Sequence, residues 1–279
     1  MKPIIKWVGG KSQIKDNILS KFPEKINKYY EPFIGGGSIL IELLCRVRNN
    51  KISVNKFYAS DINPRLINLY KQVQRNPHKI SEKLKLLEVD YKVDPENFYY
   101  KIRDKFNEDF TTALNDATYF IFLNRTYFRG LYRENSEGKF NVPFGHYKNP
   151  SFPDKEIMQL SDLIKDVEFV VKDFRFINSE PISGDFVYLD PPYYPINSTS
   201  FTTYSGKGFD EKCHKRLFRI LRNLRKKSIY FILSNSYVDE VIQNFDENKF
   251  IIEIIECKRR INSKNPESTV SEVIISPIL

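Results

Sequence analysis

Cysteine is scarce in this 279-residue chain, and its placement excludes two common uses of the thiol. Cys45, Cys213 and Cys257 lie far apart in sequence, and none forms a Cys-x-x-Cys pair or a cysteine–histidine pair with metal-site spacing. We therefore interpret them as reduced packing residues and expect no metal.

Long apolar runs are also missing: none approaches the roughly 20 residues of a membrane span, and no signal-peptide apolar region follows Met1. We expect a cytoplasmic protein without a membrane partner.

Acidic residues are outnumbered, since 35 Asp and Glu face 44 Lys and Arg and leave a net charge of +9. This excess favours a polyanionic partner, although many basic proteins bind no nucleic acid. Internal repeats and low-complexity tracts are absent as well. The 41% of hydrophobic residues suffices for the core of one large domain or of two unequal ones, so the composition indicates an ordinary soluble protein.

An acidic corner stands out in the second half of the sequence. Asp190 directly follows the β-rich run of residues 185–189. Pro191 and Pro192 then keep the chain from continuing as a strand or starting a helix at once. Asp190 and a proline carbonyl can accept hydrogen bonds from an NH2 group, and the ring of Tyr193 can stack on a flat base. This pattern favours chemistry on the amine of a flipped nucleobase. The alternative is a loop whose prolines merely end an edge strand.

Two further motifs have the residue types of a nucleotide site. A short strand, the triple glycine of residues 35–37 and an apolar helix face follow one another, as at the opening of a nucleotide-binding βα unit. It is not the full G-x-G-x-x-G, so phosphate binding is not implied. The next strand ends in Asp61, at about the distance at which the dinucleotide fingerprint places its ribose-binding acid. Asp61 also precedes Asn63 and Pro64, so a helix cap is the alternative to ribose binding.

Basic and aromatic residues gather in two segments. Near the N-terminus, Trp7 offers a stacking face between two lysines and beside Gly9 and Gly10, although a turn that caps a surface helix explains the same pattern. In the loop of residues 124–148, arginines alternate with aromatic residues. This suits a nucleic-acid surface, because arginine pairs with phosphate or guanine and an aromatic ring can wedge into a base stack. The alternative is a solvated hairpin with some buried rings. His146 stands alone in this loop, and we assign it no catalytic role.

The order of strand-like and helical segments predicts the fold. Strand-like runs alternate with helices, which is typical of a doubly wound, Rossmann-like and mostly parallel mixed α/β sheet with ligands at the carboxyl ends of its strands. Asp61, Asp173 and Asp190 all follow such strand ends. From residue 63 to about residue 124 the apolar periodicity is helical instead. We therefore expect a discontinuous sheet domain, residues 1–62 and 160–279, and a helical insertion of residues 63–159 that carries the basic loop.

Several motifs, taken in this order, resemble a known family. They are KWVGGK (residues 6–11), EPFIGGGS (31–38), ASDIN (59–63), the loop of residues 124–150 and DPPYY (190–194). They are similar to the motifs of the Dam-type, alpha-class (D12 family) DNA adenine-N6 methyltransferases, which include restriction-modification enzymes that methylate GATC. The likeness runs from Lys6 through the final strand. It implies the S-adenosylmethionine-dependent methyltransferase fold, with the sheet domain as the catalytic domain and the insertion as the target-recognition domain.

The resemblance also assigns roles to individual residues. Those expected to bind S-adenosylmethionine are Trp7, Lys11, Phe33, Gly35, Gly37, Asp61, Asp173 and Asp190. Those expected to hold the flipped adenine and act in catalysis are Asp190, Pro191, Pro192 and Tyr193. The expected DNA contacts are Lys6, Arg125, Tyr127, Phe128, Arg129, Leu131, Arg133, Asn141 and Pro143. Among these, Lys6, Leu131 and Arg133 match positions that read GATC. Phe128 matches an intercalating aromatic residue, usually tyrosine, and Arg129 stands where many relatives carry asparagine.

The reaction that the resemblance implies is direct transfer of a methyl group from S-adenosylmethionine to the N6 amine of adenine in duplex DNA, with S-adenosylhomocysteine as the product. It needs no metal and no covalent enzyme intermediate. Cytosine-N4 methylation uses the same physics, although its motif more often has serine in place of Asp190. A non-catalytic DNA-binding protein on the same fold is a second alternative. We expect a monomer that binds double-stranded DNA in a bacterial cytoplasm or nucleoid. A restriction endonuclease that acts on the same site, without a stable complex, is a further partner that the resemblance suggests.

Overall fold

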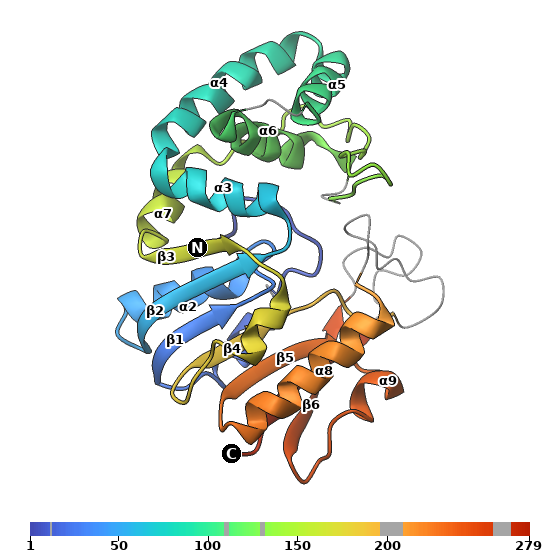
Figure 1. The fold of residues 1–279 in the computed structure, drawn as a ribbon. Coiled ribbons are helices and arrows are strands. Elements are labelled where there is room, and N and C mark those ends of the chain that lie inside the picture. The colour runs from blue at the N-terminus through green and yellow to red at the C-terminus, as the bar shows by residue number, and fades with distance from the viewer. Residues whose placement is uncertain (12, 109–111, 129–131, 196–208, 259–268) are drawn as a thin grey trace.

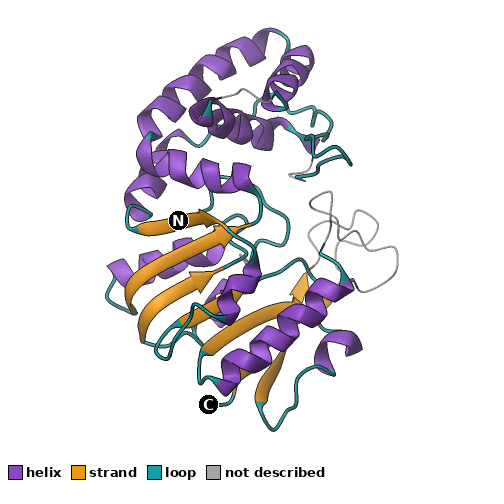
Figure 2. Cartoon of the chain, in the orientation of Figure 1, coloured by secondary structure: helices purple, strands orange, loops and turns teal. Residues whose placement is uncertain are grey.

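The computed structural model describes the chain except residues 12, 109–111, 129–131, 196–208 and 259–268 (Figure 1). It has a central sheet with helices on both faces and a second group of helices beyond one edge of this sheet (Figure 2). The strands are β1 (Lys25–Glu31), β2 (Ser53–Asp61), β3 (Val167–Val171), β4 (Phe186–Leu189), β5 (Tyr230–Ser236), β6 (Phe250–Lys258) and β7 (Thr269–Pro277).

The sheet is mixed and mostly parallel. Its strand order is β3-β2-β1-β4-β5-β7-β6; the first five strands in this order are parallel, and β7 runs antiparallel to both β5 and β6. The direction of winding changes between β1 and β4, and in open α/β sheets ligands bind at the carboxyl ends of the strands beside such a point. The arrangement confirms the expected doubly wound α/β fold.

Helices cover both faces of the sheet. They are α1 (Lys15–Leu19), α2 (Ser38–Arg48), α3 (Pro64–Arg75), α4 (Pro77–Val93), α5 (Pro95–Phe106), α6 (Ala113–Thr126), α7 (Asp154–Leu163), the short 3-10 helix η2 (Phe174–Asn178), α8 (Glu211–Lys226) and α9 (Asp239–Ile242). One buried cluster joins α1, α2, α3 and α7 to one face of the sheet, and a second joins η2, α8 and α9 to the other. Because both of its faces are covered, β4 is hydrophobic at every position and completely buried.

The helical insertion packs on the sheet through α3. The ring of Tyr70 on α3 stacks on Phe169 of β3, with ring centroids 5.1 Å apart. On the insertion side of α3, the guanidinium of Arg65 lies 3.9 Å from the centre of the Phe106 ring of α5. One buried core continues from the sheet across this junction into α4, α5 and α6 (Figure 1). The domain boundaries expected at residues 63 and 159 stay a prediction.

Local structure departs from the sequence-based expectation at two acids and one helix. The cap of α3 is Asn63, whose Oδ1 accepts a hydrogen bond from the Arg65 backbone N–H at 3.0 Å, so the helix-cap interpretation of Asp61 is wrong. Asp173 does not end a strand directly, since β3 stops two residues earlier, and it caps η2 by accepting from the Arg175 backbone N–H at 2.9 Å. The sequence analysis assigned no helix to residues 154–163, although Ile157, Leu160 and Leu163 recur at helical spacing and form the buried side of α7.

Candidate active site

The acidic corner lies at the carboxyl end of β4, in the centre of the sheet. The strand ends at Leu189, and Asp190 is the next residue. Lys11 reaches its carboxylate from the N-terminal segment, with Nζ 2.8 Å from Asp190 Oδ1. The same ammonium donates to the Gly9 carbonyl oxygen at 2.7 Å and lies 4.5 Å from the centre of the Tyr193 ring. The Lys11 side chain is 3% exposed and that of Asp190 is 20% exposed, so the pair forms a partly closed charged centre beside an aromatic face.

The Tyr193 side chain is held by an acid on β7, which lies two strands away from β4 in the sheet. Its hydroxyl donates to Oε2 of Glu272 on β7 at 2.7 Å. Burial raises the pKa of Asp190 to about 6; the Lys11 ammonium lowers this pKa and the Glu272 carboxylate raises it. Burial, with the charges of Asp190 and Glu272, raises the pKa of the Tyr193 hydroxyl well above its ordinary value. Tyr193 therefore stays neutral, while Asp190 is ionised above a pH of about 6.

The backbone after the corner is clamped by the end of β5. Oδ1 of Asn235 accepts a hydrogen bond from the Tyr194 backbone N–H at 2.9 Å, and the Ser236 hydroxyl donates to the Tyr194 carbonyl oxygen at 2.7 Å. Asn235 and Ser236 are both buried. Because Tyr193 directly precedes the clamped residue, these hydrogen bonds help to hold its ring in one place.

The triple glycine forms the turn between β1 and α2. Gly35 and Gly37 have φ angles of 47° and 70°, in the left-handed region that favours glycine. A Cβ atom on Gly35 would lie 2.8 Å from the Trp7 ring, and one on Gly37 would lie 2.8 Å from the Tyr70 hydroxyl. The turn therefore needs glycine both for its backbone conformation and for its close packing.

Asp61, the last residue of β2, faces this turn. Its Oδ2 accepts from the Gly35 backbone N–H at 3.3 Å, and its Oδ1 accepts from the Asn63 backbone N–H at 3.0 Å. Burial raises the pKa of Asp61 to about 6, although the backbone N–H groups of Asn63 and Gly35 lower it. A carboxylate has about four acceptor positions, so these two hydrogen bonds leave room for further donors. Asp61 is therefore placed to accept the hydroxyl groups of a sugar beside the glycine turn.

Aromatic residues border the glycine turn. Phe33 stacks on Phe174 of η2 with ring centroids 5.5 Å apart, and Asp173 directly precedes Phe174. Trp7 stacks on Tyr132 of the insertion, with centroids 5.6 Å apart, and so joins the turn to the insertion. The strand ends thus bring together the residues expected to bind S-adenosylmethionine, and their contact with it stays a prediction.

A buried acid to which the sequence analysis gave no role ends β1. Glu31 is 2% exposed, and its Oε2 accepts from the Tyr29 hydroxyl at 2.6 Å. Burial raises the pKa of Glu31 to about 8; the hydrogen bond from Tyr29 lowers this pKa and the charge of Asp190 raises it. Glu31 is therefore neutral at lower pH and adds no second negative charge beside Asp190. Its sequence signal was an acid at the end of a strand, four residues before the first glycine of the turn.

In the basic loop two antiparallel bridges pair Tyr127 with Phe144 and Glu134 with Phe140. We call the described residues of this region, 127–128 and 132–145, the hairpin. Arg133 is exposed on this hairpin. Its Nε donates to Asn141 Oδ1 at 2.8 Å, and its Nη2 donates to the Asn141 carbonyl oxygen at 3.2 Å. Asn141 therefore orients the guanidinium, and no other hydrogen bond ties its remaining N–H groups to the described residues.

Three more of the expected DNA contacts lie at or near the hairpin surface. Phe128 is 42% exposed, and its backbone N–H donates to the carbonyl oxygen of the exposed Pro143 at 3.0 Å. Lys6 is exposed, with Nζ 4.8 Å from the centre of the Tyr147 ring. Two expected contacts, Arg129 and Leu131, lie outside the described residues.

Tyr127 and Arg125 make internal contacts instead. Tyr127 is 1% exposed, and its hydroxyl accepts from Asn124 Nδ2 at 2.6 Å. Arg125 donates to the Ile4 carbonyl oxygen. Asn124, which the sequence analysis missed, also accepts from the Lys6 backbone N–H at 2.7 Å and donates to the Lys6 carbonyl oxygen at 2.8 Å. The end of α6 is therefore tied to the N-terminal segment, and DNA contacts of Tyr127 and Arg125 stay predictions.

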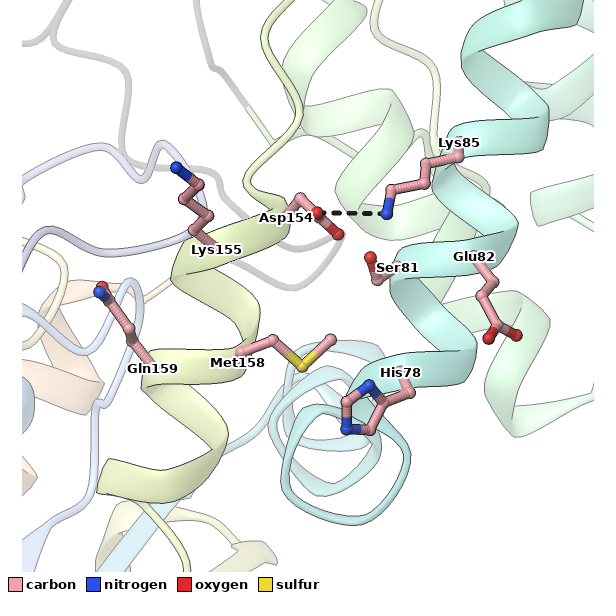
Figure 3. A pocket seen from close by; sticks show the side chains of 8 residues that line it. All are labelled: His78, Ser81, Glu82, Lys85, Asp154, Lys155, Met158 and Gln159. Carbon is pink, nitrogen blue, oxygen red and sulfur yellow. Dashed lines mark ion pairs between the residues drawn. The ribbon is translucent and has the colours of Figure 1, made fainter.

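A separate hollow of about 450 Å³ lies between α4 and α7 (Figure 3). Its lining residues are His78, Ser81, Glu82, Lys85, Asp154, Lys155, Met158 and Gln159. Lys85 and Asp154 form an ion pair across it, with Nζ 3.3 Å from Oδ2. Among these described residues there is no Phe, Tyr or Trp on which a base would stack, so the hollow lacks the groups found at the acidic corner.

The described ranges carry neither a cluster of metal ligands nor a membrane-spanning helix. No group of three or more His, Cys, Asp or Glu side chains within them is arranged to hold a metal ion. No helix in this part of the chain is both long and apolar enough to cross a membrane. Cys45 and Cys213 are free and partly buried, and the side chain of Cys257 lies outside the described part.

Comparison with known proteins gives consistent matches. Residues 7–267 match the family model of the D12 class N6 adenine-specific DNA methyltransferases. The type II methyltransferase M.MjaIII of Methanocaldococcus jannaschii is 39% identical over 95% of this chain and 94% of its own. A DNA adenine methylase of Haemophilus influenzae is 32% identical over 96% of this chain and 90% of its own. Among solved structures, the precorrin-6y C5,15-methyltransferase of Geobacter metallireducens covers 100% of this chain and 99% of its own, with 10% identity and a TM-score of 0.41.

Proposed function

The chain belongs to the D12 class of N6 adenine-specific DNA methyltransferases, and from that premise we propose that it methylates adenine within GATC in duplex DNA after flipping the base out of the helix. The observation that carries this proposal is the corner at the end of β4, where Asp190 and Tyr193 lie beside the Lys11 ammonium. A base that stays stacked in a duplex does not reach such a recessed corner, which supports flipping. Because the family is adenine-specific, we do not propose cytosine-N4 methylation.

The residues at the carboxyl ends of β1 and β2 support a binding site for S-adenosylmethionine. Asp61 would hold the ribose hydroxyls, because its carboxylate faces the glycine turn and keeps acceptor positions. Phe33 and Asp173 would border the adenine ring, one with an aromatic face and the other with a carboxylate. Gly35 and Gly37 let the backbone approach the ligand, and Trp7 and Lys11 would close the site from the N-terminal segment.

Bound S-adenosylmethionine supplies a sulfonium methyl group that is already electrophilic. The residues of the chain then have to align the adenine amine, exclude water and stabilise the charge that develops on nitrogen. Among the described residues Asp190 is paired only through Oδ1, with Lys11, so its second oxygen is left to accept one N–H of the amine. A carbonyl of Pro191 or Pro192 would accept the other. The nitrogen lone pair would then face the methyl group, and the ring of Tyr193 would stack on the base. The N–C bond would form as the S–C bond breaks, which leaves S-adenosylhomocysteine, and the carboxylate would stabilise the positive charge until the nitrogen loses one proton to water.

Recognition of GATC is assigned to the hairpin and the N-terminal segment. Arg133, oriented by Asn141, has the fork of donors that matches the O6 and N7 acceptors of guanine. The exposed ring of Phe128 would wedge into the stack that the flipped adenine leaves. The motif likeness supports Lys6 and Leu131 as further base contacts. The remaining proposed DNA contacts are Arg125, Tyr127, Arg129, Asn141 and Pro143.

We place the enzyme in the cytoplasm as a monomer, alongside a restriction endonuclease of the same specificity.

Sequencing DNA from a host that expresses the chain tests the proposed function. We expect N6-methyladenine in GATC and in no other tetranucleotide. Methylation of adenine elsewhere would refute the GATC assignment but leave the reaction intact. Transfer of tritiated methyl groups to unmethylated DNA in vitro separates an enzyme from a non-catalytic DNA-binding protein, and an absence of any transfer would refute the function.

Replacing Asp61 by alanine is expected to weaken the binding of S-adenosylmethionine about tenfold, or about 1.4 kcal/mol, because the ribose loses a charged acceptor. Calorimetry on the DNA-free protein measures this directly. The matched control is Asn63→Ala, which removes the cap of α3 and leaves the Asp61 carboxylate in place. This control should lose about 1 kcal/mol of stability but keep its cofactor affinity within about twofold. Unchanged affinity of the Asp61 variant would contradict the ribose contact.

The methyl-transfer rate is expected to fall below a pH of about 6, because the pKa of Asp190 is about 6 and only the ionised carboxylate stabilises the charge on nitrogen. In Glu272→Gln, a negative charge near Asp190 is lost, so the midpoint should move to lower pH. The cofactor acid Asp61 also has a pKa of about 6, but Glu272 does not contribute to it. Rate profiles at saturating S-adenosylmethionine from pH 5 to 8 measure both midpoints, and identical midpoints would disprove the link to Asp190.

A further inference from the structure

Helix α8 carries a disproportionate share of the positive charge. Its 16 residues include seven Lys or Arg and one Glu, a net charge of +6, whereas the whole chain has +9. The buried residues of α8 are His214, Leu217, Phe218, Ile220, Leu221 and Leu224, which pack against the sheet. The basic residues therefore gather on the outer side of the helix, which lies at the surface in Figure 1.

Three of these basic side chains have structural partners. Lys215 pairs with Glu211 one turn earlier on α8, with Nζ 2.5 Å from Oε1, and is not counted as a ligand-binding residue. Arg222 donates to the Asn244 carbonyl oxygen at 3.0 Å, and Arg225 donates to the Lys249 carbonyl oxygen at 2.9 Å. Both contacts join α8 to the segment around α9 and the start of β6. These two arginines therefore help to hold the fold together and are not counted as ligand-binding residues.

Four other basic residues form what we call the α8 stripe: Lys212, Arg216, Arg219 and Lys226. With Asn223 they follow one another at intervals of four, three, four and three residues, which places them along one side of the helix. All four are exposed. Within the described part of the chain, none of the four has a carboxylate oxygen within 4 Å.

The unpaired charges of the α8 stripe differ from those on other helices. On α2 Arg46 pairs with Glu42, and on α4 Lys92 pairs with Glu88, both at a spacing of four residues. Such pairs stabilise a solvated helix, whereas like charges at the same spacing repel one another. A face that served only solubility would be better formed by mixed charges. The α8 stripe therefore indicates an anionic ligand.

A hollow beside the α8 stripe adds hydrogen-bond donors. It has a volume of about 490 Å³ and is lined by Arg175, Asn178, Arg216, Arg219, Ile220 and Asn223. Arg216, Arg219 and the asparagine amides are groups that bind phosphate oxygens, whereas the Arg175 guanidinium already pairs with Asp173, with Nε 2.6 Å from Oδ1. Ile220 is 5% exposed, so the hollow has no large apolar anchor of the kind that protein interfaces use. Its chemistry favours a phosphate backbone over an acidic protein.

The α8 stripe starts next to the active site and leads away from it. The ring of His214, in the first turn of α8, packs on Tyr194 with centroids 5.0 Å apart. At about 1.5 Å per residue, the stripe then extends roughly 20 Å, the axial length of about six phosphates of one DNA strand. Resting on the function proposed above, we propose that the α8 stripe binds the phosphates of duplex DNA outside the methylated sequence.

The double variant Arg216→Gln/Arg219→Gln tests this proposal, because glutamine keeps the helix propensity and removes two charges. Its matched control is Lys79→Gln/Lys155→Gln, which removes two charges from exposed residues of α4 and α7. Affinity is measured for an 8-bp and a 200-bp duplex, each with one central GATC, from 50 to 200 mM salt. On the long duplex the stripe variant should bind about tenfold more weakly at low salt, with a salt slope lower by about 2. Binding and methylation of the short duplex should stay within about twofold for both variants.

Equal affinity and equal salt slope of the stripe variant and the control on the long duplex would overturn the proposal. An equal loss on both duplex lengths would also overturn it, because it would place the arginines within the site or the fold; thermal melting separates these two cases. Should the wild-type protein transfer no methyl group, the proposed function fails, while the comparison of affinities still decides whether the stripe binds DNA.

Discussion

Asp190→Ala is expected to abolish methyl transfer, with a rate at least about 1000-fold below that of the wild type, or about 4 kcal/mol of barrier. The variant lacks the carboxylate that accepts the amine hydrogen bond and stabilises the charge on nitrogen. It also leaves the Lys11 ammonium, 3% exposed, without its ion-pair partner. A positive group then faces an amine that itself becomes positive. Single-turnover transfer of tritiated methyl groups to a GATC duplex measures the loss.

The matched variant for this experiment is Asp190→Asn, which keeps the shape and one acceptor but removes the charge. We expect it to be nearly as inactive, because the charge stabilises the transition state. Thermal unfolding and cofactor calorimetry check that both proteins are folded and bind S-adenosylmethionine. Adding Lys11→Met to the asparagine variant removes the unpaired buried charge and should recover stability without recovering activity. A rate for the alanine variant within about tenfold of wild type, about 1.4 kcal/mol, would remove Asp190 from the mechanism.

Arg133→Ala is expected to cost about 1 to 3 kcal/mol on GATC, a decrease of about 5- to 160-fold in kcat/KM, because a bidentate arginine–guanine contact is lost. The structure strengthens this expectation, since Asn141 already orients the guanidinium through two hydrogen bonds. The loss should be smaller on a duplex already altered at the contacted guanine, where the wild type lacks the same contact. Methylation of GATC and singly substituted duplexes at two salt concentrations measures this difference.

Lys139→Ala is the control for the base-reading role. Lys139 is exposed on the same hairpin, and its Nζ lies 3.4 Å from Glu137 Oε2. A lysine that reaches only phosphate weakens all sequences about equally and contributes about one unit to the salt slope. Uniform loss of Arg133→Ala across all duplexes, in the manner expected of Lys139→Ala, would show that Arg133 contacts the backbone and reads no base.

The parts of the site that the sequence predicted are those in which neighbours in sequence are also neighbours in space. Asp190 follows a hydrophobic strand and precedes two prolines, so its position at the end of a strand could be predicted from the sequence. The glycines of residues 35–37 lie between a strand and a helix, and the left-handed φ angles of Gly35 and Gly37 explain their use there. For Asp61 the structure excludes only the helix-cap alternative, because the cap of α3 is two residues further along, at Asn63, and ribose binding stays a prediction. Local propensity locates a cap only to within such a distance.

The sequence alone determined the alternation of strands and helices, the strand ends that carry Asp61 and Asp190, and the motif order that identifies the family. Only the tertiary structure decided that Glu272 holds Tyr193, a contact across 79 residues, and that Asn124 holds the backbone of Lys6 across 118 residues. The physical reason is that local propensity depends on a few adjacent residues, whereas these contacts depend on strand order and on how the insertion packs against the sheet. The free energy that stabilises such contacts comes from burying the whole core. It cannot be predicted from any short segment of the sequence, because the core is formed by residues from the entire chain.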